Sequence, residues 1–268
     1  MSASGGDGAA TPPDAAQLLR YLQEVSEQPH MRARSEKRLA ASAIAPGQRV
    51  ADLGCGVGGD TLMLARHVAP GGGHVTGFDL SRAAVEFAAR RPEAAGLPVA
   101  FQQGDAAALD LRAGDLDAVW MERVLANADD PAAILREVLR VLRPGGQAVL
   151  HEFDWRTMAL DAPDREVTEF LLARLTSGMA NPAIGRALPR LCREAGFAEV
   201  RVVPGLLVMP SLGWAAAVGR WLEHLSNLAQ RGMVDEDRAA LWYDSMREAD
   251  EAGAMVCTLT SFTVYATR

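Results

Sequence analysis

Residues 50–60 read Val-Ala-Asp-Leu-Gly-Cys-Gly-Val-Gly-Gly-Asp, and this stretch decides the fold. An apolar run over 49–53 leads directly into glycines, and a helical pattern follows over 60–68. Glycine lets a backbone turn tightly and approach a ligand closely, next to the N-terminus of a helix. Three of these glycines form a G-x-G-x-x-G pattern, which is equally typical of a dinucleotide site. The stretch therefore predicts a strand, a ligand-binding turn and a helix, and it leaves the ligand open.

The same order of strand and helix repeats further along the chain. Apolar runs predict strands at 74–80, 99–102, 116–122 and 147–153, and helical patterns lie between several of them. This alternation predicts an α/β fold of the doubly wound, Rossmann-like kind, with a parallel sheet and helices on both faces. Ligands of such sheets lie at the carboxyl ends of the strands, so functional residues are expected directly after each strand.

The rest of the chain is expected to add helices on both sides of this core. A helix is predicted over 35–43, and helical structure over 211–229. Two more strands are predicted at 199–209 and 256–266. The expected parts are a disordered tail (1–13), cap helices (14–46), a cofactor-binding core (47–153) and a C-terminal half of the sheet with a helical substrate lid (154–268, the lid at about 155–182 and 210–253).

Composition narrows the class of function. The 268 residues carry a net charge of −7, which disfavours a nucleic-acid partner because such proteins usually carry a basic surface. The three cysteines are odd in number and far apart, so neither a disulfide framework nor a metal site is expected. No stretch approaches the roughly 20 apolar residues that cross a membrane, and the N-terminus lacks the pattern of a signal peptide. A cytoplasmic protein is the expectation.

Three acidic residues lie at or near the carboxyl ends of the first three predicted strands. Asp79 ends the second strand, where a carboxylate can accept bonds from both hydroxyls of a ribose, as in dinucleotide sites. Asp105 follows the third strand, where it can accept a bond from an adenine amino group. Asp52 precedes the glycines and would repel two phosphates, whereas it would attract a cationic amino-acid group. Together they favour a methyl donor over NAD.

With these motifs the chain resembles the class I S-adenosylmethionine-dependent methyltransferases, and within them the UbiE-like, type 11 group that acts on small molecules. Five motifs carry the resemblance in the family's order: 50–60, 77–81, 104–106, 116–125 and 141–146. It implies a seven-stranded sheet with the last strand antiparallel, and S-adenosyl-L-methionine as cofactor. The family commonly has histidine at the position of Asn127, so no role is carried over there.

The resemblance also implies roles for individual residues. The glycine loop Gly54-Cys55-Gly56 would pack against the methionine part of the cofactor near Asp52, and the backbone at Glu122 would approach its amine. Asp79 would hold the ribose with Leu80 against the adenine, and Asp105 and Ala106 would read the adenine edge. Arg32, on an N-terminal helix, would bind the methionine carboxylate.

Methyl transfer requires a general base only when the nucleophile keeps a proton that must leave. The candidates end the fifth strand: His151, Glu152 and Asp154. Aromatic residues in the lid region suit a planar or hydrophobic small-molecule acceptor. A homodimer is compatible with the sequence.

Three other functions remain open at this point. One is a relative of the fold that binds the same cofactor for a reaction such as cyclisation, or as a non-catalytic module. Another is an RNA or protein methyltransferase, although 121–124 lacks the N/D-P-P-Y tetrad of amino-group methylation. The last is an NAD-dependent dehydrogenase, if Asp105 is incidental.

Overall fold

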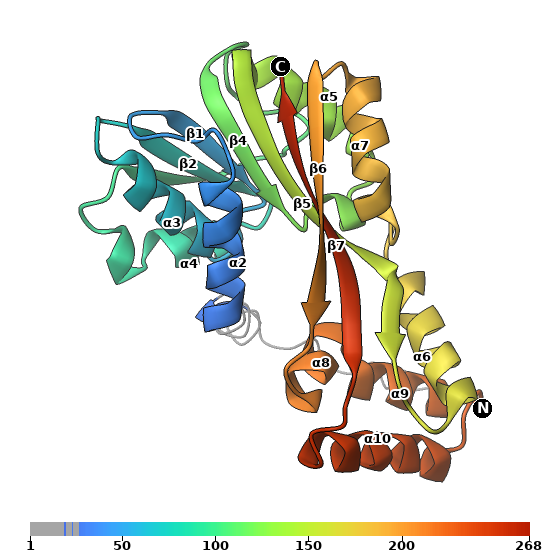
Figure 1. Cartoon of the computed structure of the whole chain (residues 1–268). Coiled ribbons are helices and arrows are strands. Elements are labelled where there is room, and N and C mark those ends of the chain that lie inside the picture. Colours follow the sequence, from blue (N-terminus) through green and yellow to red (C-terminus); the bar gives the residue numbers. More distant parts are fainter. Residues whose placement is uncertain (1–18, 20–22, 24–26) are drawn as a thin grey trace, which may run out of the picture. The chain divides into compact units, whose positions relative to one another are not determined.

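The computed structural model describes Leu19, Gln23 and residues 27–268, and the tail expected at 1–13 lies outside the described residues. Seven strands form one sheet in the order β3-β2-β1-β4-β5-β7-β6 (Figure 1). β2 pairs in parallel with β1 and β3, and β4 pairs in parallel with β5. β7 runs antiparallel to both β5 and β6. The predicted fold class, with its antiparallel last strand, is confirmed.

The chain separates into two compact units between Asp105 and Ala106. The first contains the glycine stretch at the junction of β1 and α3. Its described elements are α2 (Pro29–Ala40), β1 (Arg49–Leu53), α3 (Gly59–Val68), β2 (His74–Asp79), α4 (Arg82–Ala89), a short 3-10 helix (Pro92–Ala94) and β3 (Val99–Gln103).

The second unit holds the other four strands and most of the helices. Its elements are β4 (Leu116–Glu122), the 3-10 helix η2 (Leu125–Asn127), α5 (Pro131–Val141), β5 (Leu142–Leu160), α6 (Arg165–Ser177), α7 (Ile184–Ala195), β6 (Glu199–Val208), α8 (Leu212–Gly219), α9 (Trp221–Gln230), α10 (Glu236–Glu251) and β7 (Cys257–Thr267). No helix in the described part of the chain is long and apolar enough to cross a membrane.

The predicted start of the helix at Ser35 is wrong. α2 begins at Pro29, whose ring pre-sets the φ that the first helical turn needs. Ser35 instead lies inside the helix with 6% of its surface exposed, and its hydroxyl accepts a hydrogen bond from Arg38 at 2.8 Å. A serine that suits a helix cap can also serve as a buried acceptor, which sequence spacing does not distinguish.

The helical structure predicted over 211–229 is confirmed, but it is divided, because α8 ends at Gly219 and α9 starts at Trp221. Arg220 between them has a left-handed φ of 49°. The Trp221 indole packs so closely over Gly219 that a Cβ there would collide with its Nε1 atom. The break therefore depends on tertiary packing of one tryptophan. The fifth strand likewise runs longer than predicted, over Leu142–Leu160, with an irregularity between Asp154 and Ala159 where it pairs with β7.

Helices α6, α8, α9 and α10 form what we call the C-terminal helix group, and α8 to α10 lie beyond the carboxyl end of β6 (Figure 1). Their shared core includes Trp221 and Trp242, which are 0% and 1% exposed. The two rings meet edge to face with centroids 5.6 Å apart. The Trp242 indole N–H donates to the Thr168 hydroxyl at 2.8 Å. The group therefore shares one hydrophobic core, to which β5, β6 and β7 also contribute.

His224, in α9, makes this core sensitive to pH. Burial lowers the pKa of His224. The positive charges of Arg174 and Arg220 lower this pKa further, whereas the negative charge of Glu223 raises it. The unfolded chain therefore takes up this proton more readily than the native one, so the free energy of unfolding should fall as the pH drops below about 6.5. We expect the urea midpoint of the His224→Leu variant to change less between pH 7.5 and 5.5 than that of the wild type. The control variant His74→Leu, at an exposed histidine, should show the same change of urea midpoint as the wild type. An equal change of the midpoint in all three proteins would contradict the role of His224.

Candidate functional site

The first three strands end at one edge of the first unit. In the parallel register Leu53 lies beside Phe78, and Asp79 lies beside Gln103. The glycine loop, Asp79 and Asp105 therefore emerge at the same edge. This is the edge at which open α/β sheets bind ligands.

Hydrogen bonds fasten the glycine loop to the end of β2. The Gly54 and Cys55 N–H groups both donate to the Phe78 carbonyl, at 2.7 and 2.9 Å. The Asp79 carboxylate accepts the Gly56 N–H at 2.9 Å and the Ser81 N–H at 2.8 Å. Asp79 thus orders the loop, a contribution that the sequence did not reveal.

The loop also leaves room for a ligand against its backbone. Gly56 has a φ of 51°, and a Cβ built on it would meet no atom within 4 Å. Gly58 has a φ of 81°, and a Cβ there would lie 2.9 Å from the Phe101 ring, so this glycine serves packing instead. Gly56 therefore offers open space beside a carboxylate that can accept further hydrogen bonds from a ligand.

Two residues at the junction of β1 and the glycine loop, Asp52 and Cys55, are buried. Asp52 is 3% exposed and accepts a hydrogen bond from the Thr61 hydroxyl of α3 at 2.6 Å. The Cys55 thiol is free and buried, and burial followed by the charges of Asp52 and Asp79 raises its pKa. At neutral pH the thiol is therefore protonated and not a nucleophile.

The remaining predicted cofactor residues of this unit lie at its surface. Leu80 directly follows Asp79 and is 69% exposed, which offers an apolar surface beside the carboxylate. Asp105 is exposed, one residue after Gly104, whose N–H donates to the Asp79 carbonyl at 3.0 Å. Arg32 in α2 is exposed, and its guanidinium lies 3.9 Å from the Glu27 carboxylate.

Arg91 is a buried residue that the sequence reading missed. Its side chain is 6% exposed and donates to the Val57 carbonyl in the glycine loop at 3.2 Å. It also donates to Glu27, in the N-terminal region, at 2.7 Å and to Glu93 at 3.2 Å. Arg91 therefore joins the glycine loop to the segment before α2.

We expect Arg91→Ala to weaken S-adenosylmethionine binding about tenfold, because a hydrogen bond to a charged donor contributes about 1.5–3 kcal/mol and the loop loses one. Calorimetric titration measures the effect. Arg90, whose side chain is 79% exposed, supplies the matched control Arg90→Ala, which should bind as the wild type does. Equal affinities for both variants would show that Arg91 does not shape the loop.

The other two predicted cofactor residues, Ala106 and Glu122, belong to the second unit. Ala106 is half-buried, and Glu122 ends β4 with Arg123 at 3.3 Å from its carboxylate. Arg123 has a left-handed φ of 58°, which is uncommon for a residue with a side chain. Its N–H donates to the His151 carbonyl at 2.9 Å.

All three candidate bases are buried and have partners in the fold. His151 is 3% exposed, with its Nδ1 atom 2.9 Å from the Thr263 hydroxyl of β7. Asp154 is 0% exposed, forms an ion pair with Arg186 of α7, and accepts the Arg156 N–H at 3.2 Å. The catalytic role of these residues stays a prediction.

The Glu152 side chain accepts hydrogen bonds from backbone N–H groups rather than from another side chain. It is 1% exposed, and its Oε1 atom accepts the N–H groups of Val124 at 2.7 Å and Leu125 at 2.6 Å. Burial raises the pKa of Glu152 to about 7, while the two backbone bonds and Arg123 act in the opposite direction. Burial therefore makes the protonated form of Glu152 more favourable than it would be in water.

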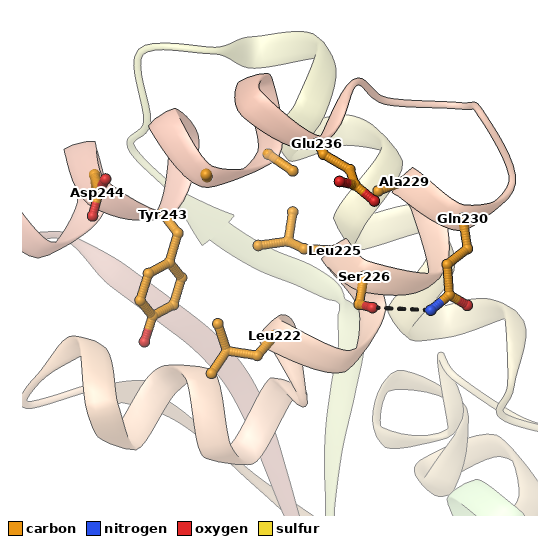
Figure 2. A pocket seen from close by; sticks show the side chains of 10 residues that line it. Leu222, Leu225, Ser226, Ala229, Gln230, Glu236, Tyr243 and Asp244 are labelled. Carbon is orange, nitrogen blue, oxygen red and sulfur yellow. Dashed lines mark hydrogen bonds between the residues drawn. The ribbon is translucent and has the colours of Figure 1, made fainter. Parts of the chain in front are cut away.

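A groove of about 370 Å³ lies between α9 and α10 (Figure 2). Apolar side chains form much of its lining, which also includes the carboxylates of Glu236 and Asp244. The Ser226 and Gln230 side chains are hydrogen-bonded at 3.3 Å on one side. The lining residues are Leu222, Leu225, Ser226, Ala229, Gln230, Glu236, Ala239, Ala240, Tyr243 and Asp244.

Comparison with known proteins indicates the family to which the chain belongs. Residues 50–146 match the family described as "Methyltransferase domain". An uncharacterized 37.1 kDa protein in transposon TN4556 of Streptomyces fradiae is 37% identical over 231 residues, which cover 78% of this chain and 66% of that protein. Demethylmenaquinone methyltransferase of Lactococcus lactis subsp. lactis is 36% identical over 130 residues, which cover 48% of this chain and 50% of that enzyme.

Among solved structures, the YcgJ protein of Bacillus subtilis matches with a TM-score of 0.60 at 18% identity, over 87% of this chain and 97% of that one. This likeness supports the fold. The chain spans about half to two thirds of the length of the two curated relatives. By its matched domain, its named relatives and its sheet, the chain belongs to the class I S-adenosylmethionine-dependent methyltransferases, as the motifs predicted.

Proposed function

We propose that this chain transfers a methyl group from S-adenosylmethionine to an oxygen, nitrogen or carbon atom of a small organic molecule. The observation that carries the proposal is the carboxylate of Asp79 beside open space at Gly56, at the shared edge of β1, β2 and β3. The chain's membership of the family supplies the cofactor, and the partial coverage of its relatives leaves the reaction of the whole protein to experiment.

The residues of the first unit would bind the cofactor by its chemical parts. Asp79 has lone pairs beyond those that Gly56 and Ser81 use, and these suit ribose hydroxyls. Exposed Leu80 would cover one face of the adenine, and Asp105 would accept from its amino group. The open backbone at Gly56 would lie along the methionine part.

The bound cofactor supplies the activated methyl group, and the protein supplies position and electrostatics. The buried state of His151, Glu152 and Asp154 favours catalysis by alignment of the acceptor, which can remove much of the barrier. A nucleophile that is already ionised, such as a quinol oxygen or an enolate carbon, needs no protein base.

We further propose that the C-terminal helix group is the lid over the acceptor, and that the acceptor is apolar or aromatic. The aromatic core of the group and the apolar groove between α9 and α10 favour this class. The name of the Lactococcus relative points the same way, because demethylmenaquinone is a quinone. We therefore choose 1,4-naphthohydroquinone as the first acceptor to be tested.

A cytoplasmic location and a homodimer complete the proposal. Three free, buried cysteines suit a reducing compartment. β6 stands at the end of the strand order and exposes Val202, Leu206 and Val208, a surface that two copies could share. Sedimentation velocity of the purified chain tests the dimer, and a single species of monomer mass would refute it.

Calorimetric titration with S-adenosylmethionine, S-adenosylhomocysteine and NAD in parallel tests the cofactor. We expect binding of the first two and none of the third. A tritiated methyl donor with 1,4-naphthohydroquinone then tests transfer. Binding of NAD alone would overturn the proposal.

A further inference from the structure

The backbone segment that follows β4 is held from two sides. Glu152 of β5 accepts the N–H groups of Val124 and Leu125. Asn181, between α6 and α7, donates from its side chain to the Leu125 carbonyl at 3.0 Å and to the Ala128 carbonyl at 2.7 Å. Its backbone N–H donates to the Ala126 carbonyl at 2.9 Å. Two residues that are distant in sequence, Glu152 and Asn181, therefore bind five backbone groups of residues 124–128.

The start of this segment adopts an unfavourable backbone conformation. Arg123 has a positive φ, and such a conformation persists only where surrounding contacts determine it. The contacts that immediately follow it are the two bonds to Glu152. The segment also lies at the carboxyl end of β4, the edge where this class of fold binds its ligands.

We propose that Glu152 is a positioning residue for the acceptor: its carboxyl oxygen holds the strained turn at Arg123 in the single conformation against which the acceptor is aligned. The inference rests on the proposed methyl transfer. It replaces a general-base role for Glu152 with a role that acts through the backbone.

Two features of the side chain support positioning over proton transfer. The Oε1 atom already accepts two short hydrogen bonds. The Oε2 atom is buried and has no hydrogen-bond partner in the described structure, so it does not reach solvent. A base must come within about 2.6–3.2 Å of the proton that it removes. The raised pKa of Glu152 is compatible with this role, because a carboxyl group whose proton is on Oε2 still accepts through Oε1.

Two substitutions separate the alternatives because they change opposite properties. Glu152→Gln removes the charge and keeps a side-chain oxygen at the same reach. Glu152→Asp keeps the charge and shortens the reach by one methylene, so that both backbone bonds are lost. Glu137→Ala is the matched control, because Glu137 accepts the Leu109 N–H at 2.7 Å at the amino side of β4.

The first measurement is amide hydrogen exchange at Val124 and Leu125, which needs neither cofactor nor acceptor. We expect exchange at least about tenfold faster in Glu152→Asp, and within about threefold of the wild type in Glu152→Gln and Glu137→Ala. Unchanged exchange in Glu152→Asp would overturn the proposal.

The second measurement is methyl transfer to 1,4-naphthohydroquinone. We expect Glu152→Asp to lower kcat by about tenfold or more while the Kd for S-adenosylmethionine stays within about threefold, and Glu152→Gln to keep most of the activity. The reverse order, with Glu152→Gln inactive and Glu152→Asp active, would assign Glu152 as a general base and overturn the proposal. A wild-type chain that binds no S-adenosylmethionine would instead refute the proposed function, and the exchange rates would still decide whether Glu152 holds the segment.

Discussion

Asp79→Ala is expected to lower the affinity for S-adenosylmethionine by about 100-fold or more. Two ribose hydroxyl bonds to a charged acceptor would be lost, each contributing about 1.5–3 kcal/mol, and about 3 kcal/mol corresponds to roughly 100-fold. The substitution also removes the acceptor for the Gly56 N–H at 2.9 Å, so the glycine loop is no longer fastened to β2. Both losses act in the same direction.

Calorimetry of Asp79→Ala and Asp79→Asn separates these two contributions. The asparagine keeps an oxygen for the Gly56 N–H and loses the charge, so its affinity should lie between those of the alanine variant and the wild type. Asp110→Ala, at an exposed carboxylate in the other unit, is the control and should bind normally. An unchanged affinity in Asp79→Ala, with a normal melting temperature, would refute the ribose assignment.

Sequence patterns predicted the parts of the site that depend on local order. Strand, glycine loop and helix follow one another within 49–68, and the alternation predicted that Asp79 and Asp105 would end at the same edge, as the register of β1 to β3 confirms. Apolar runs also predicted the strands of the sheet, because parallel strands that are buried on both faces consist mainly of apolar residues.

The contacts that hold the site in place could not be predicted from local sequence patterns. Arg91 meets Val57 across 34 residues, and Glu152 meets Val124 across 28. Such pairs depend on how each loop turns after its strand, and a charged residue next to a turn looks like any solvated one. The break at Arg220 has the same origin, since it depends on where the Trp221 ring packs.

Trp242→Ala is expected to have the largest effect on stability, at about 3–5 kcal/mol, the usual range for truncating a fully buried large aromatic residue. Trp242 is 1% exposed, stacks edge to face on Trp221 and donates to Thr168. Urea unfolding measures the loss, and Trp242→Phe should cost less because it keeps a ring in the core.

The functional consequence of Trp242→Ala tests whether the C-terminal helix group serves the acceptor. Trp242 belongs to the second unit, whereas the glycine loop and Asp79 belong to the first. A loosened helix group should therefore leave the Kd for S-adenosylmethionine within about threefold while methyl transfer to 1,4-naphthohydroquinone falls, because the acceptor loses its alignment and cofactor binding does not depend on this core. Lower stability with full transfer activity would show that the group is structural only. Loss of cofactor binding in step with stability would show that the two units unfold as one, and the helix group would then lose its assignment as a separate lid.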